Sequence, residues 1–180
     1  PPPRSSSAAS DVYKRQGLEH DLSPQQVGLF NGVDAAIHAV IHAYGSAGDT
    51  LLTTSPTFGY YAPCAGMQGM VVEAVPHDMP DFRFPIEAIR AALQRGPKIL
   101  MLCNPNNPTG TRLSAEHVLQ LASAAPDTLV VVDELYEAFT GDSVLPTADF
   151  GLYGNLLVLR SLAKTSGLAG LRMGFAIGHA

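Results

Sequence analysis

The sequence predicts a three-layer α/β/α sandwich built on a mainly parallel sheet. Short apolar runs alternate with helical patterns along the chain, and most of these runs are apolar at every position. Continuously apolar strands are typical of a sheet that helices cover on both faces. Regular alternation of strand and helix is typical of parallel strands joined by crossover helices. In such sheets ligands bind at the carboxyl ends of the strands.

Six strands and four helices are expected after residue 17. The strands are expected at Leu51–Thr54, Met70–Val75, Lys98–Cys103, Leu129–Asp133, Leu156–Arg160 and Met173–Ile177. The helices are expected at Val33–Tyr44, Phe58–Met67, Pro85–Gln94 and Ser114–Ala124. Pro85 suits a first helical turn, where an N–H group is not needed, and Ser114 suits an N-cap.

The composition is that of an ordinary globular protein. The 180 residues are 46% hydrophobic and 15% charged, with a formal net charge of −5. The absence of a basic stripe argues against a nucleic-acid partner, and no apolar run reaches the roughly 18 residues of a membrane span. Cys64 and Cys103 lie far apart and outside any CxxC pair. We therefore expect buried free thiols and a cytoplasmic protein.

The first sixteen residues differ in character from the rest of the chain. They are rich in proline, serine and alanine, as a disordered tail or transit peptide can be. The stretch from Ser6 to Gln16 can also be back-translated into a transposase adapter used for sequencing libraries. We expect 1–16 to be such a non-native segment and 17–180 to be a partial domain. The last predicted strand is followed by only a few residues, so we expect truncation there too.

Two motifs directly follow predicted strands. Cys103-Asn-Pro-Asn-Asn107-Pro-Thr-Gly110 is a turn-forming sequence that could aim the Asn107 amide at a ligand oxygen. Val130-Val-Val-Asp133-Glu-Leu-Tyr136 places a carboxylate at a strand end and a phenol three residues later. Each motif alone is also compatible with an ordinary turn or a helix-capping aspartate.

The third motif is Ser161-Leu-Ala-Lys164-Thr-Ser-Gly-Leu-Ala-Gly-Leu-Arg172-Met-Gly174. A lysine in a glycine-rich turn can form a Schiff base, while a nearby hydroxyl and guanidinium suit a phosphate. Alone, it could be a surface lysine and arginine in a loop. Pyridoxal 5'-phosphate needs an amine, a phosphate cradle and a buried carboxylate that keeps its ring nitrogen protonated. The three motifs together, in this order, therefore predict a pyridoxal-phosphate site.

These motifs resemble those of the class I/II aminotransferases of fold type I, and within them the histidinol-phosphate aminotransferases most closely. The similarity runs over essentially all of 17–178. It implies that the chain is the large cofactor-binding domain and that a small C-terminal domain is missing. It also implies a homodimer with shared active sites, in which a tyrosine of the partner contacts the phosphate. The arginine that holds the substrate carboxylate would lie outside this chain.

The resemblance assigns a role to each motif residue. Lys164 would be the Schiff-base lysine and proton shuttle, Asp133 would pair with the pyridine nitrogen, and Tyr136 and Asn107 would bind the 3-oxygen. Ser161 and Arg172 would hold the phosphate. Further cofactor contacts would come from the helix start Gly32-Val33-Asp34 and from an aromatic residue, Phe58, stacked on the ring. A helix N-terminus suits a phosphate on physical grounds as well.

Two positions depart from the family pattern. Ala163 stands where serine is frequent, which would remove one phosphate contact, and Phe58 stands where tyrosine is frequent, which keeps a stacking face without the hydroxyl. The expected reaction is transfer of an amino group, with histidinol phosphate as the favoured donor and 2-oxoglutarate as the acceptor, by a ping-pong mechanism. The alternatives are a lyase or decarboxylase of the same fold, such as a threonine-phosphate decarboxylase, or a chain that is inactive in isolation.

Other chemistry-bearing residues fit ordinary roles. His38 and His42 are four residues apart on a predicted helix, but no third ligand is evident, so no metal site is expected. Glu134 and Glu137 flank Tyr136, and we expect solvated or subunit-contact roles for them. The glycines at 167, 170 and 174 do not form a GxGxxG motif after a strand, which argues against a nicotinamide site.

Overall fold

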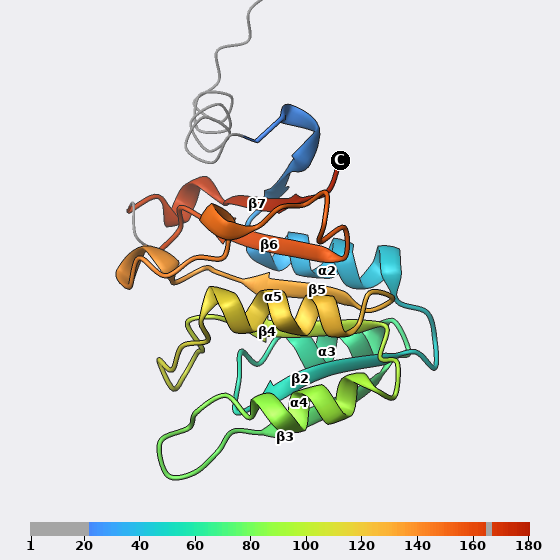
Figure 1. Cartoon of the computed structure of the whole chain (residues 1–180). Coiled ribbons are helices and arrows are strands. Elements are labelled where there is room, and N and C mark those ends of the chain that lie inside the picture. The colour runs from blue at the N-terminus through green and yellow to red at the C-terminus, as the bar shows by residue number, and fades with distance from the viewer. Residues whose placement is uncertain (1–21, 165–166) are drawn as a thin grey trace, which may run out of the picture.

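A seven-stranded mixed sheet forms the middle layer of the computed structural model, which describes residues 22–164 and 167–180 (Figure 1). Its strands are β1 (Val27–Asn31), β2 (Thr50–Ser55), β3 (Val71–Pro76), β4 (Ile99–Cys103), β5 (Leu129–Asp133), β6 (Leu156–Ser161) and β7 (Met173–Gly178). The order across the sheet is β1-β7-β6-β5-β4-β2-β3. Strands β2 to β6 pair in parallel, whereas β7 is antiparallel to both β6 and β1. The predicted mainly parallel sheet is confirmed.

Helices cover both faces of this sheet. They are α2 (Val33–Tyr44), α3 (Tyr61–Met67), α4 (Ile86–Leu93) and α5 (Ala115–Ala124), with short 3-10 turns η1 (Pro24–Gln26), η2 (Glu137–Phe139), η3 (Leu145–Thr147) and η4 (Ala169–Leu171). Helices α4 and α5 pack on one face, and α2 and α3 on the other (Figure 1). The three-layer sandwich is therefore confirmed.

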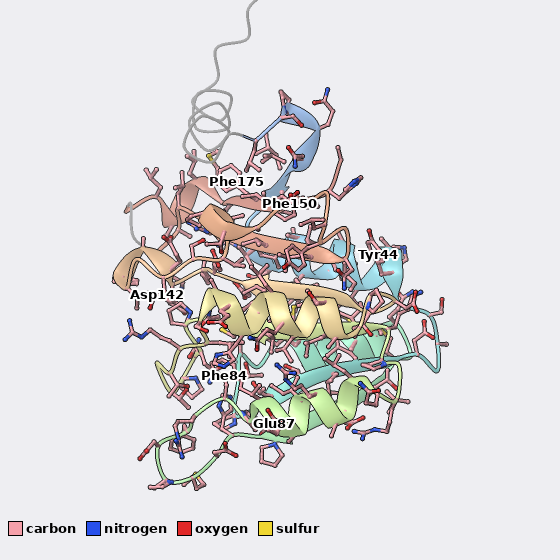
Figure 2. All side chains as sticks on the ribbon, viewed as in Figure 1. Tyr44, Phe84, Glu87, Asp142, Phe150 and Phe175 are labelled. Carbon is pink, nitrogen blue, oxygen red and sulfur yellow. The ribbon has the colours of Figure 1, made fainter. Side chains whose placement is uncertain are left out.

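The core divides into two clusters, one on each face of the sheet. In β4, Leu100 and Leu102 face α4 and α5, whereas Ile99, Met101 and Cys103 face α2 and α3. All five residues of β4 and of β5 are buried. This explains why the central strands are apolar at nearly every position. The first cluster extends beyond its two helices through Phe84, Phe150 and Phe175 (Figure 2).

The helix expected at Phe58–Met67 begins three residues later, at Tyr61. Pro63 is the physical reason, because proline has no N–H group and is accommodated only in the first turn of a helix. A helix beginning at Phe58 would place Pro63 in its interior. Residues 56–60 instead form a turn after β2.

The strand β1 was not predicted. Its burial alternates along the strand, Leu29 is about half exposed, and Gly28 interrupts the apolar pattern. It forms because Val27–Asn31 pairs in antiparallel register with β7, at one edge of the sheet.

Of the two residues expected at helix starts, Ser114 is confirmed as an N-cap, whereas Pro85 lies one residue outside its helix. The Ser114 hydroxyl accepts a hydrogen bond from the His117 N–H group at 3.2 Å, which is the expected N-cap interaction. Pro85 lies immediately before α4 rather than inside it. Cys64 and Cys103 are free and buried, as expected. Within 22–164 and 167–180, no helix is long and apolar enough to cross a bilayer.

Candidate functional site

The predicted motifs meet at one edge of the sheet. Strands β4, β5 and β6 are parallel, so their carboxyl ends lie side by side, and the antiparallel β7 begins at the same edge. The register pairs at this edge are Cys103–Asp133, Asp133–Leu159, Ser161–Gly174 and Asn31–Met173. Helix α2 starts two residues after the end of β1, which brings its N-terminus to this edge as well.

Asp133, the last residue of β5, carries a buried carboxylate that neutral groups hold in place. The Tyr61 hydroxyl donates a hydrogen bond to Asp133 Oδ2 at 2.8 Å, and the Leu135 N–H group donates one to Oδ1 at 3.1 Å. Burial raises the pKa of Asp133 to about 6, against the lowering effect of these two hydrogen bonds. None of the ion pairs formed within the described ranges includes Asp133.

Asn107 and Tyr136 contact each other beside this carboxylate. The Asn107 amide donates a hydrogen bond to the Tyr136 hydroxyl oxygen at 3.3 Å. Both residues line a pocket of about 340 Å³ together with Phe139. The turn that carries Asn107 is braced at its start, because the Asn104 side chain exchanges two hydrogen bonds of 2.9 Å with the Leu113 backbone. The structure therefore brings together the predicted amide and phenol.

Phe58 lies in the turn between β2 and α3 and is partly buried. Its ring packs edge-on against Tyr61, with 5.5 Å between the ring centroids and an interplanar angle of 77°. The turn is tied to the asparagine-rich turn through Asn106, which accepts a hydrogen bond from the Thr57 hydroxyl at 2.9 Å and donates one to the Pro56 carbonyl at 3.0 Å. The turns that carry Phe58 and Asn107 are thus held together.

The start of α2 lies directly against β7 because two glycines permit it. Gly32 has φ of +84°, and a Cβ at this position would lie 2.6 Å from the Arg172 guanidinium. A Cβ at Gly174 would lie 2.4 Å from the Gly32 carbonyl carbon. Arg172 itself has φ of +49°, in the left-handed region.

Arg172 approaches Asp34 in the first turn of α2, with 3.4 Å between Nη2 and Oδ2. Both side chains are about half exposed, so this ion pair contributes little stability. The first N–H groups of a helix have no partner within the helix. The Gly32 N–H group already donates to the Phe30 carbonyl at 2.9 Å, so the donors at this corner are the N–H groups of Val33 and Asp34 and the Arg172 guanidinium. The corner formed by Gly32, Val33, Asp34 and Arg172 suits an anion.

Ser161 and Lys164 lie at the end of β6. The Ser161 hydroxyl donates to the Met173 carbonyl at 2.8 Å and accepts from the Ala163 N–H group at 3.0 Å. In this arrangement the hydroxyl braces the loop that carries the lysine. Lys164 is exposed, three residues beyond the strand. The phosphate-binding role of Ser161 stays a prediction, as does the role of Lys164.

The expectation for Glu134 was wrong, because this carboxylate is fully buried rather than solvated. It accepts hydrogen bonds from Arg160 Nε and from the Ser143 hydroxyl at 2.8 Å each, and Arg160 also binds Glu137 at 2.6 Å. We call these residues the Arg160 cluster; they are Glu134, Glu137, Ser143 and Arg160. Because Glu134 precedes Tyr136 and Glu137 follows it, the cluster holds the chain on both sides of Tyr136. The sequence carries one signal for this cluster, because an arginine inside a predicted buried strand is rarely buried without a partner of opposite charge.

Tyr61 was also missed. It is fully buried, and it links Phe58 with Asp133 although it lies 72 residues before the latter. A buried tyrosine usually has a hydrogen-bond partner for its hydroxyl, but the sequence does not say which one. The rings of His38 and His42 stack with 6.1 Å between centroids, and no group of three potential metal ligands occurs among the described residues.

Comparisons with known proteins identify relatives of this chain. The family model "Aminotransferase class I and II" matches residues 4–180, and the adapter origin of 1–16 stays a prediction. A histidinol-phosphate aminotransferase of Caldanaerobacter subterraneus subsp. tengcongensis is 36% identical over 159 residues, covering 88% of this chain and 44% of that protein. An aromatic amino acid aminotransferase of Mycobacterium avium is 32% identical over 165 residues, covering 90% and 46% respectively.

A solved structure is similar in fold. It is the histidinol-phosphate aminotransferase of Sinorhizobium meliloti in complex with pyridoxal-5'-phosphate, with a TM-score of 0.84 and 27% identity, covering 94% of this chain and 47% of that one. The chain thus spans about half the length of the relatives that it matches. Because the family model covers nearly the whole sequence, and the sheet carries the expected motifs at one edge, the chain belongs to the class I and II aminotransferases.

Proposed function

We propose that this chain is the cofactor-binding part of a pyridoxal-phosphate-dependent aminotransferase. The observation that carries the proposal is the buried Asp133 carboxylate, held by neutral donors beside the Asn107–Tyr136 pair. Burying an unpaired carboxylate has a high free-energy cost, which a positively charged ligand can offset. A protonated pyridine ring is such a group, and the amide and phenol suit its 3-oxygen.

The donor set fits the remainder of the cofactor. The corner of Gly32, Val33, Asp34 and Arg172 offers helix N–H groups and a guanidinium for the phosphate. Asp34 would give up a weak, exposed ion pair when Arg172 turns to the phosphate. Phe58 offers an aromatic face next to Asp133 through their shared contact with Tyr61. Ser161 would add a hydroxyl donor to the phosphate site by giving up its hydrogen bond to the Met173 carbonyl.

Each residue then has a defined task in amino-group transfer. When bound, the cofactor supplies an aldehyde that accepts the amino group and a ring that draws electrons from the substrate α-carbon. Lys164 Nζ would hold the cofactor covalently at rest and move the proton at the α-carbon during the reaction. Asp133 would keep the ring nitrogen protonated, and Tyr136 and Asn107 would orient the ring. The amino donor's product would leave before 2-oxoglutarate binds, as in a ping-pong mechanism.

Histidinol phosphate is the proposed amino donor. The proposal rests on the relatives with that name, while the similarity to an aromatic amino acid aminotransferase supports aromatic donors as the alternative. Steady-state rates with histidinol phosphate and with phenylalanine, each at limiting concentration, separate the two. A higher kcat/KM for phenylalanine would contradict the histidinol-phosphate assignment.

The test of the cofactor role is Lys164→Ala in the full-length protein that contains this sequence. We expect complete loss of the covalent link, so that borohydride reduction no longer attaches the cofactor to the peptide that contains residue 164. Turnover should fall below detection. Lys98→Ala is the matched control. Lys98 is also exposed, but it lies just before β4, at the amino ends of the parallel strands and away from the predicted site. Retained labelling in Lys164→Ala would contradict the proposal.

A lyase or decarboxylase of the same fold would use the same lysine. Product analysis distinguishes these reactions, because a transaminase yields an oxo acid and an aminated acceptor, whereas a decarboxylase releases carbon dioxide. We expect amine transfer to 2-oxoglutarate without carbon dioxide release.

We further propose a cytoplasmic homodimer. Three apolar side chains near the site, Phe139, Leu168 and Leu171, are between 39% and 67% exposed, as surfaces covered by a partner subunit can be. Sedimentation equilibrium of the full-length protein measures the oligomeric state. A monomer at micromolar concentration that retains full activity would contradict a shared active site.

A further inference from the structure

The Tyr61–Asp133 contact points to a residue that acts on the cofactor through another side chain. Tyr61 is the first residue of α3 and is fully buried, and its hydroxyl lies 2.8 Å from Asp133 Oδ2. Strand β4 lies between β2 and β5, so the Tyr61 side chain, at the start of the helix that follows β2, reaches past β4 to the end of β5. The contact therefore depends on the layered fold and is not a local turn interaction.

The donor to Asp133 is neutral, and this matters chemically. An arginine or lysine would stabilise the carboxylate more strongly, but it would also neutralise the charge that a pyridine N–H⁺ has to meet. A phenol stabilises the anion and leaves its charge in place. Burial also raises the pKa of Tyr61 well above its ordinary value, so the hydroxyl keeps its proton and remains a donor.

The surroundings of Asp133 otherwise favour its protonated form. Burial is the largest effect that raises its pKa, and the acidic groups that face it act in the same direction. The titratable groups around it are Tyr61 on α3, Cys103 on β4, Asp34 on α2, and Glu134 and Tyr136 after β5. Among these, Tyr61 is the group whose hydrogen bond opposes protonation, and the Leu135 N–H group adds a second.

We propose that Tyr61 is a positioning residue that orients the Asp133 carboxylate and lowers its basicity, so that the shared proton stays on the cofactor's ring nitrogen. Its hydrogen bond to Oδ2 and that of Leu135 to Oδ1 restrict rotation of the carboxylate. The same ring supports Phe58 edge-on, so Tyr61 couples the carboxylate to the predicted stacking residue. This inference rests on the proposed function.

Tyr61→Phe in the full-length protein tests the proposal, because it removes only the hydroxyl and keeps the ring that contacts Phe58. In the cofactor-free protein, ¹³C NMR of labelled aspartate follows the Asp133 carboxyl, which is assigned by its absence in Asp133→Asn. We expect the pKa of Asp133 to rise by about one pH unit, as for loss of one hydrogen bond to a charged group. Tyr60→Phe, the same change one residue earlier, should leave it unaltered.

The second readout uses ¹⁵N-labelled pyridoxal phosphate in the loaded protein. A more basic Asp133 attracts the shared proton, so the ring-nitrogen signal of Tyr61→Phe should move toward that of the unprotonated ring. Cofactor affinity should fall about tenfold. Replacing Tyr61 with 3-fluorotyrosine, a stronger donor that keeps the ring, should lower the pKa of Asp133 instead. This opposite change keeps the proposal testable if Tyr61→Phe folds poorly.

The outcomes separate this inference from the proposed function. An unchanged Asp133 pKa and an unchanged ¹⁵N signal in Tyr61→Phe would overturn the role of Tyr61 while leaving cofactor binding intact. Failure of the unaltered protein to bind pyridoxal phosphate would overturn the proposed function, while the ¹³C measurement in the cofactor-free protein would still report on the Tyr61–Asp133 bond.

Discussion

Asp133 and Glu134 are adjacent in the chain and both carboxyl groups are buried, yet their surroundings are opposite in character. Asp133 receives hydrogen bonds from a phenol and a backbone N–H group. Glu134 accepts hydrogen bonds from the Arg160 guanidinium, the Ser143 hydroxyl and the Val144 N–H group. Successive residues at the end of a strand point to opposite faces, so the two carboxylates reach different partners.

The difference shows that the protein supplies a cation of its own for one of the two carboxylates. Glu134 is neutralised by Arg160, which binds Glu137 as well, and this ion pair attaches the segment that carries Tyr136 to β6. The Asp133 charge is stabilised by neutral groups and is available to a cationic ligand. A structural carboxylate and a proposed cofactor-binding carboxylate thus occur one residue apart.

Among substitutions that test this difference, Arg160→Met should change the free energy of unfolding most. It removes the cation and leaves the buried Glu134 carboxylate uncompensated, which should lower the free energy of unfolding by about 3–5 kcal/mol. Urea denaturation of the full-length protein measures the change. Arg112→Met is the matched control, since Arg112 pairs with Asp142 at 2.7 Å on the exposed surface, where such pairs contribute less than about 1 kcal/mol.

If Arg160→Met and Arg112→Met lower the free energy of unfolding by the same amount, then Arg160 does not compensate the buried charge of Glu134. The double variant with Glu134→Gln sharpens the result further. It removes both charges, so it should be more stable than Arg160→Met alone.

The next effect is the pH dependence of stability that Asp133 introduces. Its pKa is about 6 in the folded protein and about 4 in the unfolded chain, so between these values the folded state binds more protons. The contribution of Asp133 to stability is therefore greatest below pH 4 and is lost as the pH rises toward 6. An asparagine at this position does not titrate, so Asp133→Asn should gain about 2 kcal/mol relative to the unaltered protein across this range.

Urea denaturation of the cofactor-free, full-length protein between pH 4 and 7 checks the expected gain. Asp127→Asn is the control, because it makes the same substitution at an exposed position. A pH-independent difference for Asp133→Asn would mean that the buried carboxylate ionises like an exposed one.

The smallest expected effect concerns the hydroxyl in the Arg160 cluster. Ser143 Oγ donates to Glu134 at 2.8 Å and accepts from Arg160 Nη2 at 2.7 Å, so Ser143→Ala should cost about 1 kcal/mol. Its effect should not add to that of Arg160→Met, because both residues act in one network. Strict additivity in a double-mutant cycle would show that Ser143 contributes independently.

Much of the fold was predictable because its central strands are buried on both faces. The apolar runs at Lys98–Cys103 and Leu129–Asp133 predicted β4 and β5 almost to the residue, and Ser114 predicted the start of α5. The edge strand β1 was missed because its burial alternates and its formation depends on pairing with β7. The helical pattern from Phe58 predicted the start of α3 three residues too early, because Pro63 restricts where this helix can begin.

By itself, the sequence determined which functional side chains are present and on which strand ends and loops they lie. An aspartate at a strand end, a tyrosine three residues later, an asparagine-rich turn and a lysine loop follow from local patterns. Only the tertiary structure decided the partners of the two buried carboxylates. Strand order brings Tyr61 across β4 to Asp133, and the alternation of strand faces directs Glu134 to Arg160. Such contacts join residues distant in the chain, and periodicity and turn signals report only on near neighbours.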